Sequence, residues 1–205
     1  MPVTTTCTPA DLAAAADGDE EAFARLFRAH QPLLLRYLRT LAPGAQEDLA
    51  AETWLRVVRS LRGFEGDLDD FRAWIFTIAH RRYVDHVRAL TRRPPELDEA
   101  ATMDLPARQG VEDEVEEVLS TERALALIGR LAPDQAEVLV LRVVADLDVA
   151  ATARVVGKTR GAVRVLAHRG LRRLGRILAD QAVAREERAT KGVTPPPRTS
   201  VTGES

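Results

Sequence analysis

The sequence contains few of the features that mark cross-linked, secreted or membrane proteins. Its 205 residues include a single cysteine, Cys7, so no disulfide can form within the chain. No stretch approaches the roughly 18 consecutive apolar residues of a membrane-spanning helix. The N-terminus also lacks the basic and apolar blocks of a secretory signal. We therefore expect a soluble, cytoplasmic protein, and its 45% hydrophobic content is enough for a packed core.

The common signatures of catalytic and metal sites are also missing. The chain has no Gly-x-Ser-x-Gly, no P-loop and no Cys-His cluster. A helical di-metal site would need a Glu three residues before an inward-facing His, and none of the 4 histidines has one. His80 and His86 are interpreted as surface or phosphate-side residues. We expect no enzymatic activity, no metal, no cofactor and no small-molecule substrate.

Charge is distributed in segments of opposite sign, which the net charge of −2 conceals. Residues 94–122 contain ten acids and one base, whereas residues 154–176 contain eight bases and no acid. Residues 71–93 contain six arginines and one acid, Asp85. Solvated helices usually mix both signs, so two nearly pure basic stretches favour contact with nucleic acid.

Apolar residues recur at three- and four-residue steps, and no alternating strand of useful length is present, so the sequence predicts an all-α fold. The first long helix is expected to be capped by Asp17 or Asp19 and to end before Pro43. A second helix is expected to open at Asp48 and to end in the loop at 63–67. A third should run from about Asp69 to Leu90 and bury Phe71, Trp74, Ile75, Ile78, Ala79, Tyr83, Val87 and Leu90.

Breaks in this pattern divide the chain into four parts. We expect one small helical domain over residues 11–91 and a second over residues 116–180. A Pro- and acid-rich segment without periodicity, residues 92–115, is expected to be a flexible acidic linker. Residues 181–205 are expected to be disordered, because they cannot bury enough apolar surface to fold.

The second basic stretch has the form of a helix-turn-helix. The segment from Val149 to Leu171 begins with a helix of small residues and ends it at Gly157, which supplies the positive φ of a tight turn. Thr159 then caps a longer, basic helix. In such a module the start of the second helix reaches base edges, while flanking basic residues neutralise phosphates. An ordinary helical hairpin with a basic surface remains the alternative at this level.

Four motifs, in this order along the chain, resemble the extracytoplasmic-function (group 4) sigma factors of bacterial RNA polymerase, which contain only sigma regions 2 and 4. The motifs span about residues 11–178 and are the following: Gly18-Asp-Glu-Glu-Ala-Phe23, Glu47-Asp-Leu-Ala-Ala-Glu-Thr-Trp-Leu55, Phe71-Arg-Ala-Trp-Ile75 and Leu131-Ala-Pro-Asp-Gln-Ala-Glu-Val-Leu139.

The resemblance implies a role in promoter recognition for each helical half. It implies that the helix bearing Asp48, Leu49, Glu52, Trp54 and Leu55 docks on the β′ coiled coil of core RNA polymerase. It implies that the −10 element is melted and bound by Arg62, Phe64, Asp67, Asp69, Arg81, Arg82 and Arg88. It implies that the −35 element is contacted by Lys158, Thr159, Arg160, Arg164 and Arg169.

The partners implied by the resemblance are core RNA polymerase (β′ coiled coil and β flap), promoter DNA and an anti-sigma factor. The function it implies is that of a sigma factor directing transcription initiation. An alternative function is a transcriptional regulator, in which the helix-turn-helix acts alone and the N-terminal helices sense a signal. Only the sigma factor would have to bind core polymerase.

Overall fold

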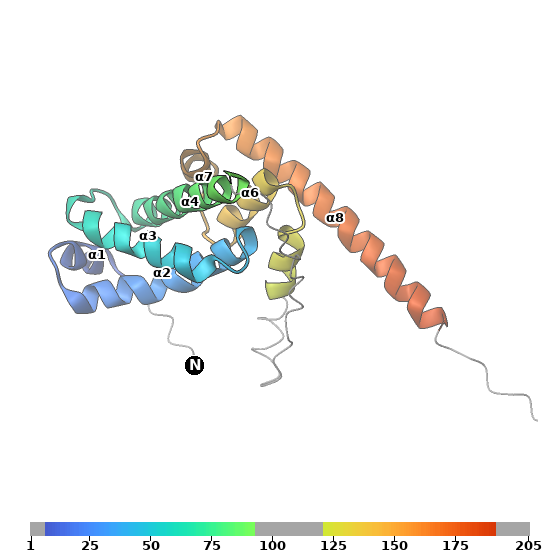
Figure 1. Cartoon of the computed structure of the whole chain (residues 1–205), viewed down its shortest axis with the longest axis horizontal. Helices are drawn as coiled ribbons and strands as arrows, with labels where there is room; N and C mark the ends of the chain where they lie inside the picture. Colours follow the sequence, from blue (N-terminus) through green and yellow to red (C-terminus); the bar gives the residue numbers. More distant parts are fainter. Residues whose placement is uncertain (1–6, 93–120, 192–205) are drawn as a thin grey trace, which may run out of the picture.

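The computed structural model describes residues 7–92 and 121–191, and within these ranges the protein is all-α, as the periodicity predicts (Figure 1). Residues 121–128 form a further helix. Figure 1 shows the first four α-helices on one side of the molecule and the C-terminal helices against them. The elements are α1 (Pro9–Ala16), α2 (Glu20–Leu41), α3 (Gln46–Ser60), the 3₁₀ turn η1 (Leu61–Gly63), α4 (Leu68–Arg92), α6 (Pro133–Val143), α7 (Val149–Val156) and α8 (Arg160–Lys191).

Local capping residues fix where the first helices begin. Asp19, one of the two predicted caps, accepts a hydrogen bond from the backbone N–H of Ala22 at 2.7 Å and starts α2. Helix α3 begins at Gln46 rather than at Asp48, which lies in its first turn. There the positive end of the helix stabilises the negative charges of Glu47 and Asp48.

Helix α4 is buried on more of its circumference than the sequence predicts, but over less of its length. Phe71, Ile75, Ile78 and Ala79 are buried as expected, and Phe76 is fully buried as well. Phe76 packs edge-on against Tyr37 of α2, with ring centroids 5.3 Å apart. The expectation that Val87 and Leu90 face inward is wrong: they are 41% and 57% exposed.

The predicted helix-turn-helix geometry is present in α7 and α8. Asp148 caps α7 by accepting from the N–H of Ala151 at 2.6 Å. Gly157 ends α7 with φ 63°, the left-handed conformation that an L side chain adopts only with strain. Thr159 Oγ1 accepts from the N–H of Ala162 at the start of α8. Val163 is fully buried and fills the corner between the two helices.

The two halves of the chain are packed against each other. Helix α6 lies against α2, and α7 lies against α4. The contact is close at Gly129, where an added Cβ would lie 3.3 Å from the backbone oxygen of Thr40. Ion pairs between Arg39 and Glu122 (3.3 Å) and between Arg154 and Asp70 (3.7 Å) also join the halves.

Helix α8 continues past Asp180 to Lys191, so the expectation of disorder from residue 181 is wrong for this stretch. Its sequence, rich in Ala, Arg and Glu, has high helix propensity, and a helix can extend by local hydrogen bonding without burial against a partner. Figure 1 shows α8 leaving the body of the protein as a single helix. The predicted linker after Arg92 and the rest of the predicted tail lie outside the described residues.

Candidate nucleic-acid interface

The exposed face of α3 carries three of the five residues predicted to bind polymerase. Asp48 and Glu52 are exposed and four residues apart, so their carboxylates share one side of the helix. Leu55 follows on α3 and is 56% exposed. Together they present two negative charges and an apolar side chain to solvent.

The other two residues of that set, Leu49 and Trp54, are buried. Trp54 is 6% exposed, and its indole N–H donates to Oε1 of Gln31 at 2.6 Å. Its ring packs against Phe23 and Phe27 of α2, with centroid distances of 5.8 and 4.9 Å. Trp54 therefore holds α3 against α2 and presents no ring surface to a partner.

A cavity of about 420 Å³ opens between α3, the loop after η1 and α4. Phe64 and Trp74 lie against each other in its wall, with ring centroids 4.9 Å apart. Arg56 and Arg81 add two exposed guanidinium groups. Aromatic faces beside cations suit an unstacked base and its phosphate. Phe64 and Arg81 belong to the residues predicted from the sequence, whereas Arg56 does not; its signal is its position four residues after Glu52 on the same helix face.

None of the remaining predicted −10 residues lines this cavity. Asp67 is the cap of α4: its Oδ1 accepts from the backbone N–H groups of Asp69 and Asp70, both at 2.9 Å. Arg62 is exposed on η1, and Asp69 pairs with Arg72 at 3.5 Å.

Two predicted −10 arginines lie further along α4. Arg82 is 3.9 Å from Glu52, so the predicted polymerase-binding and −10 sets adjoin each other. The Nε atom of Arg82 is buried without a partner among the described residues. Arg88 lies one turn after Asp85, at 4.0 Å from its carboxylate, and remains exposed.

The predicted −35 residues gather at the start of α8. Thr159, Arg160 and Arg164 are exposed there, which leaves the N-terminal turns of the helix accessible. Lys158 instead forms an ion pair with Asp134 of α6 at 3.0 Å. Arg169 lies further along α8 and lines a separate groove.

His80 is not the surface residue that the sequence suggested. Its Nδ1 lies 2.7 Å from Oε1 of Glu137, a side chain of α6 that is only 5% exposed. The same oxygen accepts a hydrogen bond from the hydroxyl of the fully buried Tyr37. Burial, together with the nearby charge of Glu137, raises the pKa of Tyr37 well above its usual value. Glu137 therefore links α2 and α4 to the C-terminal half.

No helix in residues 7–92 or 121–191 is both long and apolar enough to cross a membrane. Within the same ranges no group of three or more His, Cys, Asp or Glu side chains is arranged to hold a metal ion.

Two family models match the chain, one in each half. The model for Sigma-70 region 2 matches residues 26–93. The model for Sigma-70, region 4 matches residues 121–174, which include α7 and the first part of α8.

Curated relatives match across most of the chain. The ECF RNA polymerase sigma factor BldN of Streptomyces coelicolor is 37% identical over 168 residues, which are 80% of this chain and 63% of that protein. ShbA of Streptomyces griseus, also an ECF RNA polymerase sigma factor, is 35% identical over 82% of this chain and 92% of its own length. SigD of Mycobacterium tuberculosis is 32% identical and covers 80% of each chain.

Two solved structures share the fold. CnrH, determined in complex with the cytosolic domain of CnrY, superposes with a TM-score of 0.60 at 22% identity. That match covers 85% of this chain and 99% of CnrH. RpoE of Bartonella quintana, determined in complex with the anti-sigma factor NepR, gives 0.63 at 20% identity and covers 78% and 98% of the two chains.

Proposed function

This chain belongs to the extracytoplasmic-function sigma factors of the sigma-70 family. We therefore propose that its exposed helix faces bind both core RNA polymerase and promoter DNA, so that the polymerase is brought to promoters. The observation that carries the proposal is that Arg56, one turn after the exposed Glu52 on α3, lines the aromatic cavity, while Glu52 itself lies 3.9 Å from Arg82 of α4. One face of the protein can then hold the polymerase and an opened DNA strand together. The matches in both halves favour this function over a regulator that uses its helix-turn-helix alone.

In this proposal the polymerase β′ coiled coil docks on α3. Asp48 and Glu52 pair with basic side chains of the coiled coil, and Leu55 packs on its apolar surface. Leu49 and Trp54 act indirectly, because their burial against α2 fixes the position of α3. Helices of the C-terminal half contact the β flap.

The −10 element is bound at the cavity beside this docking face. An unpaired base stacks on Phe64 and Trp74, while Arg81 in the cavity wall and the exposed Arg62 on η1 follow the phosphates of the displaced strand. Arg82 and Arg88 extend the basic surface along α4. Asp67 supports the site by capping α4, and Asp69 by pairing with Arg72.

The −35 element is read as a duplex by the helix-turn-helix. Arg160 and Arg164 reach base edges or phosphates from the exposed start of α8, and the Thr159 hydroxyl, whose oxygen accepts from the N–H of Ala162, donates to a DNA phosphate. Lys158 joins them once its ion pair with Asp134 opens. Arg169 extends this contact toward the middle of the helix.

We further propose that this chain acts in the cytoplasm, catalyses no reaction itself, and is regulated by an anti-sigma factor. RpoE is a structural neighbour determined with the anti-sigma factor NepR, which supports a comparable partner here. The polymerase supplies the active site for RNA synthesis, while the residues of this chain supply binding and orientation.

Runoff transcription tests the function directly. Purified chain and core RNA polymerase are incubated with a library of genomic fragments, and the 5′ ends of the transcripts are mapped. We expect start sites that depend on the chain and share two upstream sequence elements. Core polymerase that gains no specific start sites, or a chain that does not co-purify with it, would contradict the proposal.

A further inference from the structure

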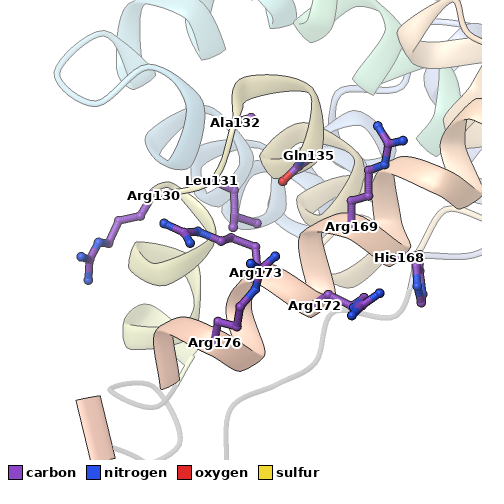
Figure 2. Close-up of a pocket in the computed structure, with 9 residues that line it drawn as sticks. All are labelled: Arg130, Leu131, Ala132, Gln135, His168, Arg169, Arg172, Arg173 and Arg176. Carbon is purple, nitrogen blue, oxygen red and sulfur yellow. The ribbon is translucent and has the colours of Figure 1, made fainter. Parts of the chain in front are cut away.

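A groove of about 790 Å³, here called the arginine groove, lies between α8 and the segment that leads into α6 (Figure 2). Figure 2 shows Arg130 on that segment, with Arg173 and Arg176 of α8 across from it. Its uncharged lining consists of Leu131, Ala132 and Gln135, and no carboxylate of the described residues lines it. The positively charged or titratable lining residues are Arg130, His168, Arg169, Arg172, Arg173 and Arg176.

The five arginines of the groove have no acidic partner in the part of the chain whose side chains are described. Within residues 7–92 and 121–183 none of them forms an ion pair, although nine other ion pairs are present there. All five are exposed. Guanidinium groups clustered on a concave surface produce a strong positive potential, and their planar forks can bind carboxylates in a bidentate manner. The groove is therefore suited to a partner that carries several carboxylates.

A matching set of carboxylates occurs in the sequence shortly before the groove. Residues 94–122 contain ten acids and one base, and five of these acids are concentrated in residues 112–117, here called the acidic segment. The acidic segment lies outside the described residues, and the chain re-enters the structure at Thr121. Its carboxylates belong to Glu112, Asp113, Glu114, Glu116 and Glu117.

The acidic segment is attached close to the groove. Residues 121–128 form a helix, and Arg130 and Leu131 of the groove wall follow it almost directly. A helix of this length spans about 12 Å. The chain between Thr121 and the acidic segment can span about 14 Å to its near end and about 32 Å to its far end when extended. The carboxylates can therefore return along this helix to the groove, and covalent attachment at such a distance gives an effective concentration in the millimolar range.

We propose that the acidic segment binds the arginine groove of the same chain in the free protein. Five carboxylates then neutralise five arginines, and such a network of ion pairs is stronger than isolated exposed pairs. The contact goes beyond the proposed function, because it requires neither polymerase nor DNA. Arg169 also belongs to the predicted −35 set, so the bound acidic segment competes with other polyanions for this part of α8.

Carbodiimide coupling of the full chain tests the contact, because the reagent joins a carboxylate to a lysine amine only where the two groups touch. The 3.0 Å pair between Lys158 and Asp134 serves as an internal reference. Arg173→Lys and Arg176→Lys, made separately, keep the charge and place an amine in the groove. Arg164→Lys is the matched control, since Arg164 is exposed on the same helix but does not line the groove. Mass spectrometry of the monomer identifies the coupled peptides.

We expect the groove variants to couple to residues 112–117 at least about fivefold more than the control does, relative to the reference pair. The coupling should fall in about 1 M salt, where the Debye length is about 3 Å. Equal coupling in the groove and control variants would overturn the proposal. So would coupling only between two chains, which would assign the groove to a second copy, or coupling only to carboxylates outside the acidic segment.

The affinity of the full chain for poly-glutamate gives a second measurement. Neutralising the acidic segment should leave the groove accessible and raise this affinity at least about twofold, the change expected when the effective concentration of the segment equals its Kd. An unchanged affinity, or the same rise in the matched control, would contradict the contact. The variant combines Glu112→Gln, Asp113→Asn, Glu114→Gln, Glu116→Gln and Glu117→Gln. The matched control neutralises acids that precede the segment: Glu96→Gln, Asp98→Asn, Glu99→Gln and Asp104→Asn.

Discussion

The hydroxyl of Tyr37 on α2 donates a hydrogen bond of 2.5 Å to Oε1 of Glu137 on α6. The two residues are 100 positions apart, and both are buried at the contact between the halves. A buried carboxylate is stable only while its hydrogen-bond partners remain in place. Separating the halves would expose Glu137 to water, which can replace those partners. The hydrogen bond between Tyr37 and Glu137 therefore stabilises the packed arrangement of the two halves.

Tyr37→Phe should weaken this contact. The change removes the hydroxyl and leaves Glu137 with His80 as its close partner, so we expect the free energy of unfolding to fall by about 1.5 to 3 kcal/mol. Urea denaturation measures this free energy of unfolding. Tyr83→Phe is the matched control, since Tyr83 is half-buried nearby on α4 and makes no hydrogen bond among the described residues. Equal losses in the two variants would show that the Tyr37 hydrogen bond contributes nothing specific.

Replacement of Gly157 or Gly175 by alanine should change the stability of the protein in opposite directions. No atom lies within 4 Å of a Cβ built at Gly157 or at Gly175. Gly157 has φ 63°, so Gly157→Ala should destabilise the protein by about 1 kcal/mol through backbone strain alone. Gly175 lies within α8, so Gly175→Ala should stabilise that helix by up to about 1 kcal/mol. Thermal unfolding followed by circular dichroism checks both, and a stabilising Gly157→Ala would contradict the turn geometry.

The helices and their caps could be predicted because they depend on local chemistry. Asp19, Gly157 and Thr159 act within one turn of their own position, and the sequence shows them directly. The packing between the halves could not be predicted in this way. Phe76 and Glu137 are buried because elements far apart in the chain pack against them. The apolar periodicity within a single helix does not indicate which other elements pack against it.

The candidate site, like the fold, could be predicted from the sequence only in part. Exposed charges such as Glu52 and Arg164 were identified from motif position and lie on accessible helix faces. Trp54 and Asp67 occur in the same motifs, but the structure shows one packed against α2 and the other capping α4. A motif identifies a set of residues that occur together in the sequence. Whether each of them can contact a partner depends on the exposure of its side chain, which is known only from the folded structure.

Reversing the charge on α3 should prevent assembly with polymerase. Asp48→Arg with Glu52→Arg replaces two exposed carboxylates, and within the described protein it removes the 3.9 Å pair with Arg82 and the favourable interaction of Asp48 with the positive end of α3. Because exposed pairs contribute at most about 1 kcal/mol, the variant should fold normally. We expect loss of co-purification with core polymerase. The control Asp17→Arg with Asp180→Arg reverses two exposed charges elsewhere and should co-purify. Normal assembly of the α3 variant would remove these carboxylates from the interface.

Phe64→Leu should impair DNA opening more than folding. Leucine keeps an apolar side chain against Phe71 but removes the flat ring that faces Trp74. Stacking of a base on an aromatic ring contributes about 1 to 3 kcal/mol, so open complexes should fall between about fivefold and a hundredfold. Permanganate reactivity of unpaired thymines measures them. Phe76→Leu, which disrupts the ring pair with Tyr37 at 5.3 Å away from the cavity, should leave opening unchanged. Equal effects would indicate a general loss of stability.

His30 should make the protein less stable in mild acid. Burial lowers the pKa of His30 below 6.5, with a smaller contribution from the charge of Arg72, although the hydrogen bond to Leu26 O at 2.8 Å opposes this. The unfolded chain then binds a proton at a pH where the folded protein does not. The contribution of His30 to the free energy of unfolding is therefore constant above about pH 6.5 and falls below it, by at most about 1.4 kcal/mol per pH unit for one proton.

His30→Gln removes this titration and keeps a side-chain donor for Leu26, so the variant should lose stability less steeply than the parent between neutral pH and about pH 5. Asp11 does not interfere, because hydrogen bonds from Thr8 and Arg25 lower its pKa to about 2, below this window. Urea midpoints measured across the range compare the two proteins. His168→Gln, which removes an exposed imidazole on α8, should follow the parent. A His30→Gln variant with the parent's pH slope would mean that another group takes up the proton on unfolding, and that the burial of His30 beside Phe71 has no part in the acid sensitivity.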